Sequence, residues 1–396
     1  MQQLLRSIQE IEKLGNYPHI DTIESSLGPK VKIDGIDYYL FSSNGYLGLS
    51  SLPQCKAAAI KAIEKYGTGS GASRIVSGTY DIHTKLENEI ADFKEKESAM
   101  VLTSGYSANV SLIPVLANSF SILGKKPDFK TMIFSDEYNH ASIIDGIKLS
   151  GSAVTIYPHK DMGFLEEMLQ KHDSYRKLII TDSIFSMDGD IAPLDKIVEL
   201  KKKYNAMLLI DEAHATGVIG KYGKGVANFL NVTKDVDIIM GTFSKALGSI
   251  GAYITSSREV IKLLKVAVRG YVFSTALPPP DLAVSREAIK ILKDNPGLSD
   301  ELQKKSNFLR DSLNKIGFST LGSQTQIIPI LIGDIMMALK FQTELRKRKI
   351  IAPCIQWPAV PRDKSRIRFS VMLTHSKEDI EYLINSCQKI KDDLHI

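Results

Sequence analysis

Short apolar runs alternate with helix-like stretches between about residues 95 and 260. The runs are rich in β-branched and large apolar side chains, a pattern typical of strands that are covered on both faces. We predict strands at residues 99–104, 131–136, 153–158, 177–183, 206–213, 236–242 and 251–257. Apolar residues at helical spacing lie between them, as at 107–120, 141–150 and 194–205. This alternation predicts an α/β fold in which helices flank a mostly parallel sheet.

The pattern changes near residue 280. Two long helical patterns are followed there by two apolar strands and a last helix, at residues 278–297, 298–317, 326–333, 365–373 and 377–394. This order predicts a smaller α+β domain at the C-terminal end. We therefore expect an N-terminal arm at 1–45, a large domain at 46–280 and a small domain at 281–396.

Composition narrows the class of protein. The 396-residue chain is 43% apolar and 24% charged, which is ordinary for a globular protein. No apolar run approaches the roughly 18 residues of a membrane span. Residues 1–14 have the pattern of an amphipathic helix and lack the apolar segment of a signal peptide. We expect a cytoplasmic protein that neither spans nor binds a membrane.

Cysteine spacing and charge exclude two further classes. Cys55, Cys354 and Cys387 are far apart and have no histidine at metal-ligand spacing, so we expect no metal site. The net charge of +5 is spread along the chain, so nothing favours nucleic-acid binding. A diffuse excess of this size modestly favours an anionic substrate.

A lysine stands among small residues just after the predicted strand at 236–242. Its neighbours are Gly241, Thr242, Ser244 and Ala246, and the lysine itself is Lys245. Most lysines in such loops are exposed and take part in no chemistry. The other strand ends favour a different interpretation, because ligands of parallel α/β sheets gather at the carboxyl ends of strands.

Chemically active side chains follow four other predicted strands. They are, in chain order, Gly105 and Tyr106, then His140, then Asp182, Ser186 and Asp188, and finally Asp211 and His214. Taken singly, each is more often structural, since an acid after a strand is commonly a helix cap. Their coincidence at one rim of a sheet predicts a single site.

These groups suit pyridoxal 5′-phosphate. Its aldehyde needs an amine, and a lysine in a dry pocket such as Lys245 becomes nucleophilic as its pKa falls. Its pyridine nitrogen needs a carboxylate to stay protonated, and Asp211 is the candidate. His140 can stack on the ring, and His214 can donate to the phenolic oxygen. The phosphate needs N–H groups at a helix start and hydroxyl groups, which are available at Gly105, Tyr106, Thr242 and Ser244.

The motifs around these residues are similar to those of the α-oxoamine synthases, a family of fold-type-I pyridoxal-phosphate enzymes. The similar stretches run almost from end to end: FSSNGYLGLS (41–50), YGTGSGASRIVSGTYDIHTKLE (66–87), TSGYSAN (103–109), DEYNHASIIDG (136–146), FSMDGDIAPL (185–194), DEAHATGVIG (211–220), GTFSKALGSIGAYI (241–254), VFSTALPPP (272–280) and RIRFSVMLTHSKEDI (366–380). The resemblance implies the fold-type-I transferase fold, the cofactor pyridoxal 5′-phosphate and a homodimer with shared active sites.

The resemblance also implies roles for individual residues. Lys245 resembles the Schiff-base lysine, and Asp211 resembles the partner of the ring nitrogen. His214 resembles the donor to the ring hydroxyl, His140 the residue stacked on the ring, and Ser186 a serine near the ring hydroxyl.

Further residues resemble those that hold the phosphate and the substrate. Gly105, Tyr106 and Thr242 resemble the phosphate cradle, and Thr275 resembles a threonine lent to that phosphate by the second subunit. Arg368 resembles the arginine that holds the substrate carboxylate, with Asn44 nearby. A guanidinium group can bind a carboxylate through two parallel hydrogen bonds, which is why an arginine suits this role.

Members of this family condense an amino acid with an acyl thioester, releasing CO2 and a thiol. Stretches such as FSMDGDIAPL are most similar to members that join L-alanine to a pimeloyl thioester, giving 8-amino-7-oxononanoate in biotin biosynthesis. Others, such as GTYDIH and PAVP, are similar to serine palmitoyltransferases. Serine, or the glycine of 2-amino-3-oxobutyrate CoA ligases, therefore stays open as the amino acid.

The acyl group is less determined. Gln356 and Ala359 stand where an arginine and a threonine are usual in the alanine-using members, near the acyl end of the site. The carrier can be coenzyme A or an acyl carrier protein, and the chain length is open.

Three other classes compete with this interpretation. The glycines of GTGSGAS (67–73) follow a helical pattern and not a strand, which argues against a nicotinamide dehydrogenase. An aminotransferase on the same scaffold would use Lys245, Asp211 and His214 as well. A non-catalytic subunit would typically lack the lysine.

Overall fold

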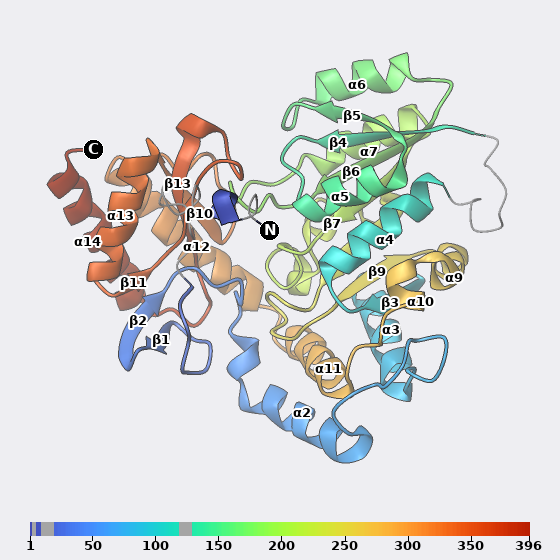
Figure 1. Ribbon diagram of the computed structural model, residues 1–396, viewed down its shortest axis with the longest axis horizontal. Coiled ribbons are helices and arrows are strands. Elements are labelled where there is room, and N and C mark those ends of the chain that lie inside the picture. Colours follow the sequence, from blue (N-terminus) through green and yellow to red (C-terminus); the bar gives the residue numbers. More distant parts are fainter. Residues whose placement is uncertain (2–4, 9–19, 119–128) are drawn as a thin grey trace.

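A seven-stranded sheet forms the centre of the computed structural model, which describes residues 1, 5–8, 20–118 and 129–396 (Figure 1). Its strands are β3 (Ser98–Leu102), β4 (Thr131–Asp136), β5 (Ala153–Tyr157), β6 (Arg176–Asp182), β7 (Met207–Asp211), β8 (Ile238–Thr242) and β9 (Ala252–Ser256). The spatial order is β3-β9-β8-β7-β6-β4-β5, and only β9 runs antiparallel to its neighbours. The predicted strands and the mostly parallel sheet are confirmed.

Helices cover both faces of this sheet. In β6, Leu178 and Ile180 belong to one buried cluster, together with side chains of α4 (Gly105–Ala117), α5 (Ala141–Ser150) and α9 (Arg258–Ala267). Ile179, between them, belongs to the cluster on the opposite face. The helices that contribute to that second cluster include α3 (Asp81–Phe93), α6 (Met162–Lys171) and α7 (Leu194–Lys203). Burial of alternate side chains on both faces explains why these strands are apolar throughout.

The C-terminal part contains a second, antiparallel sheet in the order β10-β13-β12. Its elements are α11 (Pro279–Asp294), α12 (Leu298–Lys315), β10 (Ile327–Gly333), α13 (Ile335–Lys347), β12 (Cys354–Ile355), β13 (Ser365–Ser370) and α14 (Lys377–Leu394). The sequence predicted all but α13 and β12. Helix α11 packs on α2 (Pro53–Tyr66) and α3, so it lies against elements of the predicted large domain (Figure 1). The domain boundary at 280 stays a prediction.

The N-terminal strands join the C-terminal part. β1 (Lys30–Ile33) and β2 (Ile36–Leu40) form a hairpin whose turn residues, Asp34 and Gly35, both have positive φ, as a two-residue hairpin turn requires. β2 then pairs in parallel with β11 (Ile350–Ile351). Residues 41–48 leave this small sheet and run towards the carboxyl ends of the central strands. Most of the predicted helix at 1–14, and the end of the one at 107–120, fall outside the described residues.

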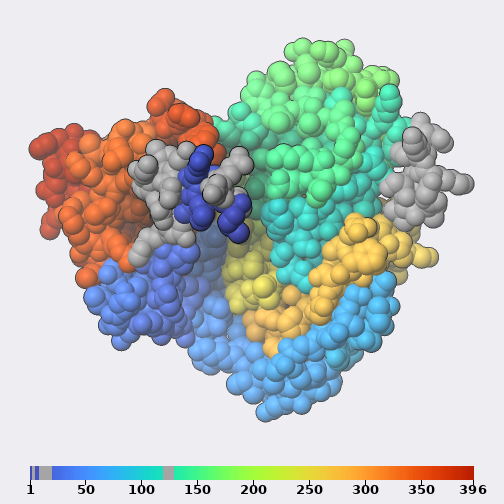
Figure 2. Space-filling model, in the orientation of Figure 1, coloured from blue at the N-terminus to red at the C-terminus, as the bar shows by residue number. Residues whose placement is uncertain are grey.

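Short helical segments complete the described chain: α8 (Val226–Phe229), α10 (Arg269–Val272) and 3₁₀ turns at Leu49–Ser51, Lys221–Gly223, Thr233–Asp235 and Arg362–Lys364. Among the described helices, none has the length and apolar character needed to cross a bilayer. In the space-filling view, the C-terminal part in orange and red lies beside the green region of β4 to β7, with a recess between them (Figure 2).

Candidate active site

Ten of the predicted site residues line one cavity of about 220 Å³. They come from the last residues of five of the central strands and the segments that follow them, and they are Gly105, Tyr106, His140, Asp182, Ser186, Asp211, His214, Thr242, Ser244 and Lys245. The carboxyl ends of parallel strands meet at one edge of a sheet, which is why residues so far apart in sequence converge. Asn44, Arg368 and Thr275 do not line this cavity.

Lys245 supplies the cavity with a reactive amine. It lies three residues beyond β8 and is half-buried in the cavity wall. Burial lowers the pKa of Lys245 to about 8, although the charges of Asp211 and Asp182 act in the opposite direction. About a tenth of this amine is therefore uncharged at pH 7, far more than for an ordinary lysine, and the uncharged form is the nucleophile.

Asp211 is held by two donors. It is the last residue of β7 and is 4% exposed. Its Oδ1 accepts a hydrogen bond from the N–H of Ala213 at 2.8 Å, and its Oδ2 accepts one from Asn109 Nδ2 at 2.9 Å. These bonds fix the direction of the carboxylate, which is what a partner of a cofactor nitrogen needs.

A chain of hydrogen bonds joins Asp211 to His140. Asn109 Nδ2 also donates to Ser142 Oγ at 2.9 Å, and Ser142 Oγ lies 2.7 Å from His140 Nδ1. The N–H of Ser142 donates to the same Nδ1 at 3.2 Å. Because His140 Nδ1 accepts this N–H, the neutral imidazole carries its proton on Nε2. Burial lowers the pKa of His140, which favours this neutral form.

Asn109 and Ser142 were not among the predicted site residues. A usable signal exists for Asn109, because it precedes three apolar residues of α4 by three, four and seven positions and so lies on the apolar face of the helix. The structure buries it to 1% exposure. Ser142 belongs to α5 and gives no such signal, since its role depends on the helix that packs beside it.

Asp182 fixes the backbone of the same segment. Its Oδ2 accepts a hydrogen bond from the N–H of His140 at 2.7 Å. Burial and the neighbouring Asp211 carboxylate raise the pKa of Asp182 well above its usual value. Two neighbouring buried carboxylates repel each other when both are charged, so a single charge is favoured. The raised pKa of Asp182 leaves that charge on Asp211, where a partner of a cofactor nitrogen needs it.

His214 contacts the cavity as a neutral imidazole. Burial, followed by the charges of Lys245 and Arg368, lowers the pKa of His214 well below its usual value. Its Nδ1 lies 2.6 Å from the hydroxyl oxygen of Tyr46, and the same oxygen lies 3.1 Å from Asn44 Oδ1. Tyr46, which was not predicted as a site residue, thus joins Asn44 of the predicted N-terminal arm to a residue of the cavity wall.

Arg368 and Asn44, predicted to hold the substrate carboxylate, lie together beside the cavity. Arg368 Nη2 donates to Asn44 Oδ1 at 3.3 Å, and its Nε donates to the carbonyl oxygen of Ser186 at 2.5 Å. Ser186 lines the cavity, so this bond connects β13 directly to the site. Arg368 is 6% exposed, which keeps its guanidinium in a fixed orientation.

The start of α4 provides a close-fitting cradle. Ser104 caps the helix by accepting a hydrogen bond from the N–H of Ser107 at 3.1 Å. A Cβ on Gly105 would come within 2.7 Å of Thr242 Cγ2, so only glycine leaves this backbone open. Ser244 Oγ donates to Thr242 Oγ1 at 3.2 Å. N–H groups at a helix start beside hydroxyl groups fit a phosphate.

Tyr106 and Thr275 differ in their placement. Tyr106 borders the cavity, and its hydroxyl donates to Asp145 Oδ2 at 2.6 Å. Thr275 is exposed and forms an isolated bridge with Ser73, away from the cavity of its own chain. Its contribution to a second subunit stays a prediction.

A second cavity of about 480 Å³ adjoins the first and shares His140 and Ser186 with it. Its other lining residues are mostly apolar, and they include Tyr138, Ile144, Phe185, Met187, Pro358, Ala359, Val360 and Pro361. Arg366 and Asp188, also in the wall, form an ion pair with each other. Ala359, expected near the acyl end of the site, therefore lies in this cavity.

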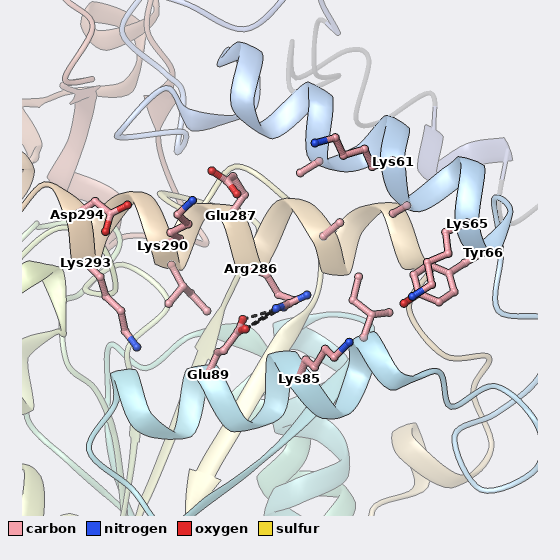
Figure 3. A pocket seen from close by; sticks show the side chains of 15 residues that line it. Lys61, Lys65, Tyr66, Lys85, Glu89, Arg286, Glu287, Lys290, Lys293 and Asp294 are labelled. Atoms are coloured by element: carbon pink, nitrogen blue, oxygen red, sulfur yellow. Dashed lines mark hydrogen bonds and ion pairs between the residues drawn. The ribbon is translucent and has the colours of Figure 1, made fainter.

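The groove between α2, α3 and α11 has no such chemistry (Figure 3). Six lysines and arginines line it, but several are paired with acids. Arg286, for example, forms two hydrogen bonds from Nε and one from Nη2 to the carboxylate of Glu89. None of the predicted site residues lies there.

Comparisons with known proteins agree with this geometry. The profile of the family "Aminotransferase class I and II" matches residues 36–386. The 8-amino-7-oxononanoate synthase of Geobacter sulfurreducens is 42% identical over 98% of both chains. That of Thermoanaerobacter pseudethanolicus is 42% identical over 98% of this chain and 96% of its own.

Solved structures extend the comparison. A serine palmitoyltransferase from Sphingomonas wittichii has a TM-score of 0.92 at 29% identity, covering 99% of this chain and 97% of its own. An 8-amino-7-oxononanoate synthase from Francisella tularensis has a TM-score of 0.77 at 28% identity, covering 91% of this chain and 99% of its own.

The fold and the residues around Lys245 define a fold-type-I pyridoxal-phosphate enzyme, and the residues present fit that cofactor. The glycine cradle, the held Asp211 carboxylate and the low-pKa amine all match its chemical groups. Within this class, the chain belongs to the α-oxoamine synthase family.

Proposed function

We propose that the chain condenses L-alanine with a pimeloyl thioester, giving 8-amino-7-oxononanoate, CO2 and a free thiol. Relatives named 8-amino-7-oxononanoate synthase at 40–42% identity over nearly the full length support this. The observation that carries the proposal is the pair of adjoining cavities. One holds Lys245 and Asp211, the other is mostly apolar, and His140 and Ser186 border both.

The residues of the first cavity would hold the cofactor at three points. Lys245 would bind its aldehyde, Asp211 would face its ring nitrogen, and the start of α4 with Thr242 would hold its phosphate. The bound cofactor supplies an electron sink for the charge that develops when bonds to the amino-acid Cα break.

The chain's own residues then position the substrates and move the proton. Arg368 and Asn44 bind the amino-acid carboxylate and orient the bond to be broken. Lys245, with a pKa near 8, accepts the Cα proton as its uncharged amine and later returns it. His140 borders both cavities and so stands where the amino acid and the acyl group meet.

We further propose that two copies of this chain share their sites, with Thr275 completing the phosphate cradle of the partner. Large apolar side chains near Thr275 and its bridge partner Ser73 are exposed. Phe273, two residues before Thr275, is 73% exposed, and Ile75 and Val76, just after Ser73, are 57% and 76% exposed. Exposed apolar side chains grouped in this way are typical of an interface between subunits.

A serine palmitoyltransferase is the second candidate. Several solved structures of that enzyme resemble this chain with TM-scores of 0.91 to 0.93. A panel of substrates separates the two functions. We expect the spectrum of the purified holoenzyme to change with L-alanine, and turnover to follow with pimeloyl thioesters of coenzyme A or an acyl carrier protein. A response to L-serine together with palmitoyl thioester would favour the second candidate.

Substitution of Lys245 by alanine tests the site itself. We expect Lys245→Ala to fold but to lose turnover, because the amine that accepts the Cα proton is gone. Borohydride reduction followed by mass spectrometry should attach the cofactor to Lys245 in the wild type and to no lysine in the variant. Lys262→Ala, on the exposed side of α9, is the control and should retain both properties. Normal turnover by Lys245→Ala would refute the assignment.

A further inference from the structure

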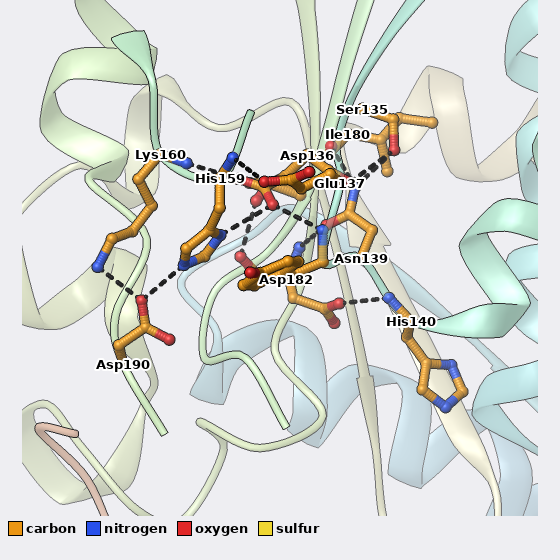
Figure 4. A network of polar contacts seen from close by, with 12 residues as sticks. Ser135, Asp136, Glu137, Asn139, His140, His159, Lys160, Ile180, Asp182 and Asp190 are labelled. Atoms are coloured by element: carbon orange, nitrogen blue, oxygen red, sulfur yellow. Dashed lines mark hydrogen bonds and ion pairs between the residues drawn. The ribbon is translucent and has the colours of Figure 1, made fainter. Parts of the chain in front are cut away.

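His159 joins two buried acids, Asp136 and Asp190, that the proposed mechanism does not use (Figure 4). It lies in the connection between β5 and α6. Its Nδ1 is 2.9 Å from Asp136 Oδ1, at the end of β4, and its Nε2 is 2.9 Å from Asp190 Oδ2, in the turn after β6. Both carboxylates are buried, at 3% and 4% exposure.

This arrangement requires a charged imidazole. Each ring nitrogen faces a carboxylate oxygen, so both nitrogens must donate, and only the imidazolium has two N–H groups. Burial acts to lower the pKa of His159, but the hydrogen bonds and charges of Asp136 and Asp190 outweigh it and raise the pKa to about 9. Lys160 Nζ also pairs with Asp190 Oδ2 at 2.6 Å, so two cations balance two acids.

The faces and edge of the same ring contact the wall of the second cavity. The ring of Tyr138 stacks on His159 at 4.4 Å between centroids, with 21° between the planes. The ring of Phe185 meets it edge to face, also at 4.4 Å, with 88° between the planes. Tyr138 and Phe185 both line the second cavity. A cation against aromatic rings is attracted by their π-electrons, which adds to the packing.

The contact between His159 and Asp190 also holds the turn at residues 185–190. The N–H of Phe185 donates to the carbonyl oxygen of Asp190 at 3.1 Å, and that of Gly189 donates to the carbonyl oxygen of Phe185 at 2.9 Å. The turn carries Ser186, Met187 and Asp188, which line the second cavity. On its other side it is bound to β13 through the Arg366–Asp188 pair and the bond from Arg368 to Ser186. The N–H of Gln324 and the hydroxyl of Thr325 also donate to the carbonyl oxygen of Gly189. The position of the turn therefore depends in part on the contact between His159 and Asp190, together with β13 and residues 324–325.

We propose that His159 is a positioning residue for the acyl thioester: clamped between Asp136 and Asp190, it fixes Tyr138, Phe185 and the 185–190 turn and so sets which acyl group the second cavity accepts. This rests on the proposed function, since it takes the second cavity as the acyl site. His159 lines neither cavity, so it acts only through the residues that it holds.

A pair of matched variants tests this. In His159→Gln, the glutamine is similar in size to histidine, but it donates hydrogen bonds from a single amide nitrogen and has no charge. His172→Gln is the control, because His172 also packs on aromatic rings, those of Phe134 and Tyr175, and has no contact with either cavity. We expect His159→Gln to raise the KM for the acyl thioester by about tenfold, since misplacing binding groups by about 1 Å can cost up to a hundredfold. The KM for the amino acid should be unchanged.

The same holoenzymes are then assayed with acyl thioesters of increasing chain length. His159→Gln should flatten the preference that the wild type shows, and His172→Gln should keep it. Asp190→Asn, which keeps size and removes the charge, is the second variant if His159→Gln does not fold, and it should shift the same KM.

The outcomes separate this inference from the proposed function. If the wild type does not react with L-alanine and pimeloyl thioesters, the proposed function is wrong. The chain-length assay then tests His159 with the acyl thioester that the wild type does use. If the wild type is active and His159→Gln matches His172→Gln in both KM values, the inference is wrong. An equal rise in both KM values together with a lower melting temperature would also overturn the inference, because a purely structural residue would give that result.

Discussion

At the scale of single residues, the pKa values of two lysines beside neighbouring acids, Lys245 beside Asp211 and Lys94 beside Glu212, shift in opposite directions. Asp211 lines the cavity that contains Lys245, but no hydrogen bond or ion pair joins them, and burial lowers the pKa of that lysine to about 8. Glu212 points to the other side of the chain and forms an ion pair with Lys94. Burial acts to lower the pKa of Lys94 too, but the contact with Glu212 raises it. Direct contact therefore decides whether a buried lysine is reactive or structural.

The pKa of Lys245 predicts a pH dependence. We expect the apoprotein to capture pyridoxal 5′-phosphate faster as pH rises through about 8, because only the uncharged amine reacts. The charge of Asp211 favours the ammonium form, so Asp211→Asn should move this midpoint to lower pH. Stopped-flow absorbance measures the rate. Asp195→Asn is the control, because Asp195 is exposed in the first turn of α7, and it should leave the midpoint in place. An unmoved midpoint in Asp211→Asn would show that the charge of Asp211 does not act on Lys245.

At the scale of elements, the first turn of α4 combines a cap with a close contact to β8. Ser104 satisfies one N–H of that turn and leaves others available to a phosphate. Gly105 brings the helix start against Thr242, the last residue of β8. Helix and strand therefore form one rigid cradle.

Alanine at Gly105 tests the cradle. The added Cβ would lie 2.7 Å from Thr242 Cγ2, and the branched threonine cannot turn away easily. We expect Gly105→Ala to weaken cofactor binding by about 1–3 kcal/mol, the usual range for overpacking. Equilibrium titration of the apoprotein gives the affinity. Gly163→Ala is the control, because that glycine is in the first turn of α6, where a Cβ has room at 3.4 Å. Unchanged affinity in Gly105→Ala would show that the contact relaxes freely.

At the scale of the whole molecule, segments distant in sequence meet around the sheet. Asn44, at the end of the predicted N-terminal arm, contacts Arg368, and Tyr46, just after the arm, contacts His214, while β2 pairs with β11. Behind the site, the Lys94–Glu212 pair joins the end of α3 to the segment after β7. Glu212 Oε1 also accepts the N–H of Ala227 at 2.9 Å. One buried pair thus ties three parts of the fold together.

Removing one partner of this pair should destabilise the molecule. Glu212→Gln leaves the Lys94 ammonium buried beside a neutral amide, and we expect a loss of about 3–5 kcal/mol in the free energy of unfolding. Urea unfolding measures it. The double variant Lys94→Met with Glu212→Leu should recover most of the loss, because an apolar pair of similar size has no charge to desolvate. Equal stability of Glu212→Gln and wild type would show that the pair is not a structural tie.

The amino-acid sequence by itself determined the central strands and the residues at their ends. Strands such as β4, β8 and β9 are buried at every position, so their apolar runs were unambiguous. Gly105, His140 and Lys245 lie within four residues after such strands, and Asp211 is the last residue of one. Parallel strands bring their carboxyl ends to one edge of the sheet. Local pattern and topology together thus predicted where the site lies.

Only the tertiary structure decided which polar groups meet. The antiparallel direction of β9, the Asn109–Ser142–His140 chain and the bridging of Asp136 and Asp190 by His159 all depend on strand order and helix packing. Apolar periodicity acts over a few residues, whereas the partner of a buried charge is set by which segments fold against each other. That information is distributed over the whole chain, so no local stretch of sequence contains it.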